Sequence, residues 1–156
     1  MYTLDAWIGE AMIVAFCGHS DYAGNPTDEK KILNILEKEI QDKPVEFFLG
    51  GYGGFDKFSH CCAKKYKSRH KNARIVLITP YLPTRNVSDQ ERENFDLLLY
   101  PPLESIPPRY AIVQRNKWIV SQADLIIAYV KNSFGGAYAM YRYAQKQNKT
   151  IYNIVP

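Results

Sequence analysis

The sequence predicts an α/β fold, in which helices cover both faces of a doubly wound, mostly parallel β-sheet. Apolar runs alternate along the chain with segments of helical periodicity. The runs are continuous, as in VEFFL at 45–49, which is typical of parallel strands buried on both faces. Seven of the nine glycines follow three of these runs. Because ligands bind at the carboxyl ends of strands in such sheets, the glycines mark a candidate binding site.

Length, charge and cysteine content limit the class of protein. The 156 residues suit one domain, and the net charge of +4 fits a partner that carries phosphate but is too small to indicate nucleic acid. The three cysteines are an odd number, which is typical of reduced thiols in the cytoplasm. The N-terminal apolar stretch is too short to cross a bilayer. We therefore expect a cytoplasmic protein without a membrane anchor.

The first half of the chain predicts three strands and two helices. In order, we expect a strand at 12–17, a helix capped by Thr27 and ending near Gln41, a strand at 45–49, a helix whose apolar face holds Phe55, Phe58, Cys62 and Tyr66, and a strand at 74–79. Residues 1–11 fit no element. We expect them to form an N-terminal arm outside a single domain at 12–156, and leave open a flexible arm, an oligomer contact, as in a homodimer, or an over-long start.

Six of the nine prolines lie between Pro80 and Pro108, so we expect an irregular loop there that acts as a lid or an interface. Within it, Ser88 and Glu91 have capping-box spacing, and 96–100 could form a short strand. The remaining elements are a helix from Pro108 with an inner face of Ile112, Asn116, Ile119 and Val120, a strand at 125–130, a helix at 136–147 and a strand at 150–155.

The first glycine loop, Gly18-His19-Ser20, offers bare amides, an imidazole and a hydroxyl at the expected crevice. We favour a binding loop over an ordinary turn. Zinc-ligand spacing is absent from His60, Cys61, Cys62 and His70, so we expect no metal, and no cofactor is indicated.

The densest glycine cluster is Gly50-Gly51-Tyr52-Gly53-Gly54, followed by Asp56. It matches neither the dinucleotide-binding fingerprint nor the P-loop. Glycine costs conformational entropy on folding, so such a cluster indicates the close approach of a ligand or of another backbone. Asp56 could hold a ribose hydroxyl, or could only favour the start of the next helix.

The third loop, Gly135-Gly136-Ala137, precedes a helix, so phosphate against that helix N-terminus is physically reasonable. Arg115 and Asn116 lie within the preceding predicted helix. The arginine could clamp a phosphate if this helix borders the crevice. By itself, the pattern favours a surface arginine whose stem packs flat on the protein.

In order, the segments VAFCGHS, FFLGGYGGFD, ITPYL, YPPLE, RNKWIVSQADLIIAYV and GGAYAMYRYA resemble the SLOG superfamily, in particular its small YpsA-like bacterial members. The resemblance covers about 12–155. It implies a Rossmann-like fold that binds nucleotides or nucleotide derivatives.

The superfamily includes the lonely-guy phosphoribohydrolases, which use an Arg-Lys pair and a PGGxGTxxE loop. By this resemblance Arg115 matches their arginine, whereas Asn116 replaces their lysine. Their glutamate corresponds to Met140 or Arg142, depending on register, and their threonine to Ala137 or Ala139. Glycosidic cleavage normally needs a carboxylate. The chain therefore keeps the features for binding and lacks those for the known chemistry.

Our first hypothesis is binding or sensing of a nucleotide-derived small molecule, such as ADP-ribose, NAD or a nucleoside monophosphate. The alternative is a nucleotide N-glycosidase, with Arg115 and with Asp56, Glu104 or another carboxylate in the missing role. A third reading, binding of single-stranded DNA, follows from the superfamily's DNA-processing members. It needs a basic groove, whereas the basic cluster at 63–74 lies at a helix end, so we do not expect nucleic acid.

Overall fold

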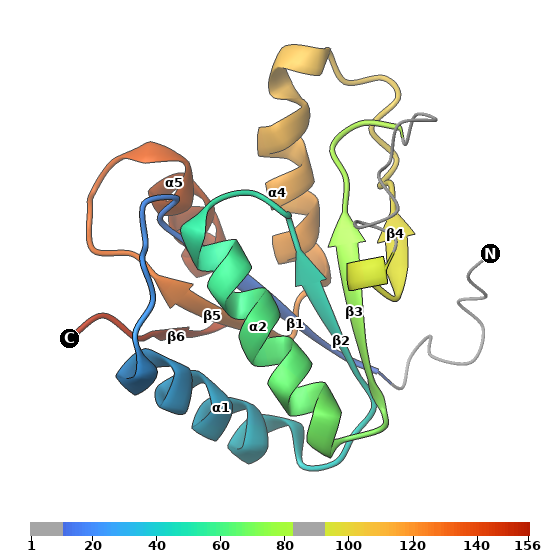
Figure 1. Cartoon of the computed structure of the whole chain (residues 1–156). Coiled ribbons are helices and arrows are strands. Elements are labelled where there is room, and N and C mark those ends of the chain that lie inside the picture. The colour runs from blue at the N-terminus through green and yellow to red at the C-terminus, as the bar shows by residue number, and fades with distance from the viewer. Residues whose placement is uncertain (1–10, 83–92) are drawn as a thin grey trace.

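The computed structural model describes residues 11–82 and 93–156. In these residues six strands form one parallel sheet, in the order β4-β3-β2-β1-β5-β6 (Figure 1). The strands are β1 (Met12–Gly18), β2 (Val45–Leu49), β3 (Ala73–Ile78), β4 (Leu97–Leu99), β5 (Leu125–Tyr129) and β6 (Thr150–Asn153). The chain steps outward from β1 to β4 and then returns to β5 on the other side of β1. The strand order therefore reverses between β1 and β5, as in a doubly wound sheet.

Helices α1 (Pro26–Ile40) and α2 (Gly54–Arg69) cover one face, and α4 (Ala111–Gln122) and α5 (Gly135–Lys146) cover the other (Figure 1). Successive strand residues enter opposite cores: Phe47 packs with α1 and α2, whereas Phe48 packs with α4 and α5. Both are buried, which explains why the strands are continuously apolar. None of the helices described has both the length and the apolar character to cross a membrane.

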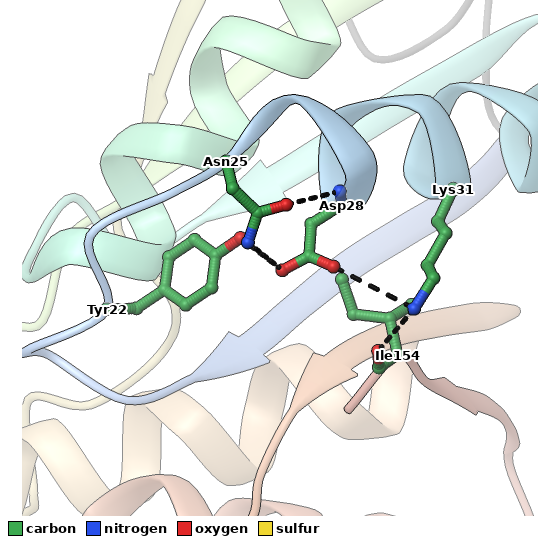
Figure 2. A network of polar contacts seen from close by, with 5 residues as sticks. All are labelled: Tyr22, Asn25, Asp28, Lys31 and Ile154. Carbon is green, nitrogen blue, oxygen red and sulfur yellow. Dashed lines mark hydrogen bonds and ion pairs between the residues drawn. The ribbon is translucent and has the colours of Figure 1, made fainter. Parts of the chain in front are cut away.

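Helix α1 begins two residues earlier than predicted, with Asn25 rather than Thr27 as its N-cap. Pro26 takes the first helical position, and Asn25 Oδ1 accepts the Asp28 amide at 2.7 Å. Figure 2 shows how the buried Asp28 carboxylate also accepts the Tyr22 hydroxyl at 2.7 Å and the Asn25 side-chain amide at 3.0 Å. This network fixes the end of the loop that leaves β1.

The inner face of α4 differs from the prediction at two of its four residues, Ile112 and Asn116, of which Asn116 is partly buried. Ala111, Arg115, Ile119 and Val120 are buried, so Ile119 and Val120 were predicted correctly, whereas Ile112 is 50% exposed. Residues Pro108–Tyr110 form a 3-10 turn before the helix. The short strand expected at 96–100 is β4. The capping box of Ser88 and Glu91, and residues 1–10 of the arm, lie outside the described residues.

Candidate functional site

A cavity of about 500 Å³ opens at the carboxyl end of the sheet, beside the reversal between β1 and β5. The loops after β1, β2 and β5 line it together with α4 and α5. Most of the predicted site residues belong to the lining: Gly18, His19, Ser20, Gly50, Tyr52, Asp56, Arg115, Asn116, Gly135, Gly136 and Ala137. Gly51, Gly53 and Gly54 do not. The topology thus brings all three predicted loops to one cavity.

Gly53 and Gly54 pack against the loop after β1 rather than toward the cavity. The Gly54 amide donates to the Ser20 carbonyl at 2.7 Å, and a Cβ on Gly54 would lie 2.0 Å from the Tyr22 carbonyl oxygen. Gly53 has a φ of +91°, and a Cβ there would lie 2.9 Å from the Ser20 Cα. The close approach at this cluster is therefore made by another backbone, the second of the two alternatives that the sequence left open.

The N-terminus of α2 is closed by the same contacts. Beyond the Gly54 bond, the Phe55 amide donates to the His19 carbonyl at 3.3 Å, and Asp56 Oδ2 accepts the Tyr52 amide at 3.1 Å. Burial raises the pKa of the Asp56 carboxyl above its ordinary value, although the Tyr52 amide and the charge of Arg115 favour the ionised form. Asp56 thus holds the loop before its own helix while it borders the cavity.

Arg115 is 6% exposed, so the surface position that the sequence allowed is wrong. Its Nη1 donates to the carbonyls of Gly50 at 3.1 Å and Ile78 at 2.8 Å, and its Nε donates to Asn116 Oδ1 at 2.9 Å. Within the described part of the chain, Nη2 has no hydrogen-bond partner. The guanidinium therefore joins α4 to the ends of β2 and β3. Its Nη2 group can still donate hydrogen bonds at the cavity wall.

His19 joins the first loop to the third. Its Nε2 accepts the amides of Lys131 at 3.0 Å and Asn132 at 3.3 Å, while its own amide donates to the Tyr129 carbonyl at 3.3 Å. A nitrogen that accepts two amides carries no proton, so the ring proton is on Nδ1. Next to it, burial raises the pKa of the Cys17 thiol to about 12, and the thiol donates to the Ala137 carbonyl at 3.1 Å. Burial and the bond to Ala137 therefore favour the protonated thiol of Cys17 over the thiolate.

The N-terminus of α5 differs from that of α2 because it is open. In residues 11–82 and 93–156, no side chain or carbonyl accepts the amides of Gly135, Gly136 or Ala137. A Cβ on Gly135 or Gly136 would meet no atom within 4 Å. First-turn amides have no partner within a helix. The third loop therefore presents free donors and a positive helix end to the cavity.

Sequence reasoning missed part of the lining. The additional residues are Phe16, Cys17, Asp21, Ile112, Ile119, Asn132, Phe134 and Met140. Phe134 directly precedes the glycine pair and Asn132 lies two residues before Phe134, so both could have been found from their position in the loop. Met140 lines the cavity and Arg142 does not; among carboxylates, Asp21 and Asp56 line it and Glu104 does not.

No model of a known protein family matches the sequence, and no curated protein matches it. Several solved structures match the fold. The molybdenum cofactor binding protein from Rippkaea orientalis has a TM-score of 0.59 and 22% identity, over 92% of this chain and 76% of that chain. DNA processing protein A (DprA) from Streptococcus pneumoniae has a TM-score of 0.64 and 15% identity, over 94% of this chain and 51% of that chain.

DprA from Helicobacter pylori, whose structure concerns its binding of single-stranded DNA, has a TM-score of 0.60 and 17% identity, over 91% of this chain and 64% of that chain. This chain thus spans about half to two thirds of the DprA proteins. The Rossmann-like fold that the resemblance implied is confirmed.

Proposed function

We propose that the cavity binds a nucleotide or nucleotide derivative, with a phosphate group against the N-terminus of α5. The observation that carries this proposal is the contrast between two helix N-termini at one cavity. The amides of Gly54 and Phe55 in α2 are paired with backbone carbonyls, whereas those of Gly135, Gly136 and Ala137 have no partner in the described residues. Free amides and the positive helix end both favour an anion.

Gly136 supports the same position for the phosphate. A Cβ there would meet open space, and its backbone lies outside the left-handed region, so the folded chain itself does not require glycine. A helix is destabilised by glycine relative to alanine by about 1 kcal/mol. An anion that must approach the backbone closely gives a reason for glycine at this position.

Arg115 and Met140 favour binding over catalysis. Nη2 of Arg115, which has no hydrogen-bond partner among the described residues, lies on a guanidinium that adds a positive charge to the cavity wall, which suits a second anionic or hydroxyl group of the ligand. Met140 provides an apolar surface where the resemblance leads one to look for a glutamate. Without that carboxylate, the expected activity is recognition of an intact ligand.

Calorimetry with nucleoside monophosphates, ADP-ribose, NAD and cyclic nucleotides tests the proposal, after a thermal-shift screen. A matched pair of variants locates the site: Gly136→Val places carbon atoms over the free amides, while Ala139→Val adds similar bulk at an exposed position of α5 outside the cavity. We expect Gly136→Val alone to weaken binding. Absence of binding by the wild type at millimolar concentration, or equal binding by both variants, would contradict the proposal.

Hydrolysis of an N-glycosidic bond is a second candidate, favoured by Asp56. This carboxyl borders the cavity and its pKa is raised by burial, a state suited to a general acid. Release of free base from nucleoside monophosphates, followed by chromatography and lost in Asp56→Asn, would support it. Binding without turnover would decide for the first proposal.

Binding of single-stranded DNA is a third candidate, favoured by the likeness to DprA. Such binding depends on phosphate contacts and therefore weakens steeply as salt is raised. A gel shift with a labelled oligonucleotide at two salt concentrations tests it. A salt-sensitive shift that Gly136→Val leaves unchanged would place DNA away from the proposed phosphate position.

A further inference from the structure

Two aromatic side chains of the cavity are largely exposed to solvent. Tyr52 is 81% exposed and Phe134 is 73% exposed, the highest values among the large hydrophobic residues that the structure describes. Both line the cavity. Aromatic rings that stand in solvent at the edge of a concave site are typical of surfaces that a ligand covers.

The backbone holds both rings at the tips of their loops. Tyr52 lies between Gly51, at φ +78°, and Gly53, at φ +91°, and its amide is bound by Asp56. Phe134 immediately precedes Gly135, also at φ +91°. Side chains other than glycine rarely adopt these values. The glycines beside each ring thus allow the sharp turns that direct Tyr52 and Phe134 outward, which gives the cluster around Tyr52 a second role beyond packing.

The positions of the two loops in the sheet suit a ring between them. Tyr52 follows β2 and Phe134 follows β5, the two strands that flank β1. Neighbouring strands lie about 4.8 Å apart, so two intervals separate the ends of β2 and β5 by roughly 10 Å. A ring stacked between two others needs two centroid separations, which together span about 9 to 14 Å. The two loops therefore leave the sheet at a separation comparable to that of two rings with a third stacked between them.

The side-chain amides of Asn116 and Asn132 also line the cavity. Asn132 can offer a donor and an acceptor, and Asn116 a donor, because its Oδ1 already accepts Arg115 Nε; the polar edge of a heteroaromatic ring requires such partners. Phe16, Ile119 and Met140 contribute apolar lining. The cavity therefore combines stacking surfaces, edge partners and an apolar wall.

We infer that the cavity binds a planar heteroaromatic ring stacked between Tyr52 and Phe134, in a ligand whose phosphate lies at the N-terminus of α5. The inference rests on the proposed function for the phosphate and adds the ring and the two residues that select it. A ligand without a ring loses both stacking contacts. The site then discriminates bases from sugars by the two aromatic side chains.

Calorimetry with three kinds of probe tests the inference: adenosine and guanosine 5′-monophosphates, the two nucleosides without phosphate, and ribose 5-phosphate without a base. Tyr52→Leu and Phe134→Leu keep an apolar side chain and remove the ring. Tyr110→Leu is the matched control, because Tyr110 is 47% exposed and does not line the cavity. All three positions are exposed, so we expect the variants to retain the fold.

We expect Tyr52→Leu and Phe134→Leu each to weaken binding of the monophosphates by roughly 5- to 100-fold, the usual effect of losing one stacked aromatic partner. Binding of ribose 5-phosphate and the behaviour of Tyr110→Leu stay unchanged. Nucleosides that bind as tightly as the monophosphates, with the same loss in the leucine variants, would uphold the ring site and refute the phosphate position.

Three outcomes overturn the inference. Ribose 5-phosphate that binds as tightly as the monophosphates leaves the phosphate position standing and removes the ring site. Monophosphates that bind equally to the wild type and to both leucine variants also remove the ring site and leave the phosphate position standing. A wild-type protein that binds none of the probes refutes both the ring site and the proposed function.

Discussion

The imidazole of His19 holds the backbone of Lys131 across the point where the strand order reverses, through a hydrogen bond of 3.0 Å from the Lys131 amide to Nε2. A second bond, from the Asn132 amide, has a length of 3.3 Å. The loop that leads to the open end of α5 is therefore positioned by a residue from the loop after β1. His19 is a positioning residue in this arrangement.

Replacing His19 with leucine leaves the amides of Lys131 and Asn132 without their acceptor. We expect the free energy of unfolding to fall by about 1 to 3 kcal/mol, and affinity for the phosphate ligand to fall with it. Urea unfolding and calorimetry measure the two effects. His19→Gln retains an acceptor oxygen and should recover part of both losses. A leucine variant with wild-type affinity would show that the third loop holds its shape without this contact.

Arg115→Met removes the donor that binds the carbonyls of Gly50 and Ile78. Because both bonds come from a charged group that is nearly fully buried, we expect a loss of roughly 2 to 4 kcal/mol in the free energy of unfolding. Arg109→Met is the control, since Arg109 is exposed and lies over the ring of Tyr110. Denaturant unfolding that shows equal midpoints for the two variants would refute the structural role of Arg115.

Gly54→Ala and Gly136→Ala should have opposite effects on stability. The new Cβ at Gly54 would lie 2.0 Å from the Tyr22 carbonyl oxygen, a backbone atom that cannot turn away, so we expect a loss of more than about 2 kcal/mol. At Gly136 the Cβ meets no atom within 4 Å, and alanine's better helix propensity adds up to about 1 kcal/mol. Thermal unfolding distinguishes the two. A destabilised Gly136→Ala variant would contradict the open geometry of the third loop.

The sheet could be predicted from the sequence because a strand that is buried on both faces is a continuous run of apolar residues. Phe47 and Phe48 enter opposite cores and are both apolar, so β2 is visible as a continuous run. The face of α4 could not be predicted in the same way. Arg115 is buried because carbonyls at Gly50 and Ile78, remote in sequence, satisfy it. Periodicity alone assigns an arginine to the solvent side.

The candidate site was predictable in location and not in detail. Parallel strands carry their carboxyl ends to one edge, so Gly18, Gly50 and Gly135 were expected to meet there, and all three line the cavity. The orientation of Gly54 depends on its contact with the Tyr22 carbonyl, which only the folded chain brings near. A glycine cluster in the sequence indicates a close approach to the backbone. It does not distinguish the approach of a ligand from that of another backbone segment.

We expect the buried Asp56 carboxyl to make the free energy of unfolding depend on pH. Burial raises the pKa of this carboxyl above its ordinary value of 3.8, so the folded protein holds the proton more tightly than the unfolded chain does. Its contribution to stability is therefore complete below pH 3.8 and is lost as the pH rises through the folded-state pKa. At neutral pH the group therefore costs stability relative to the unfolded chain.

Asp56→Asn removes that charge and keeps an oxygen that can accept the Tyr52 amide. We expect the variant to be more stable than the wild type at pH 7, with the gain shrinking as the pH is lowered toward 4. Urea unfolding at both pH values measures it. Asp124→Asn is the matched control, because Asp124 also accepts an amide, from Ile13, but is exposed, and we expect no gain from it. A less stable Asp56→Asn variant at pH 7 would mean that attraction between Asp56 and Arg115 exceeds the cost of burial.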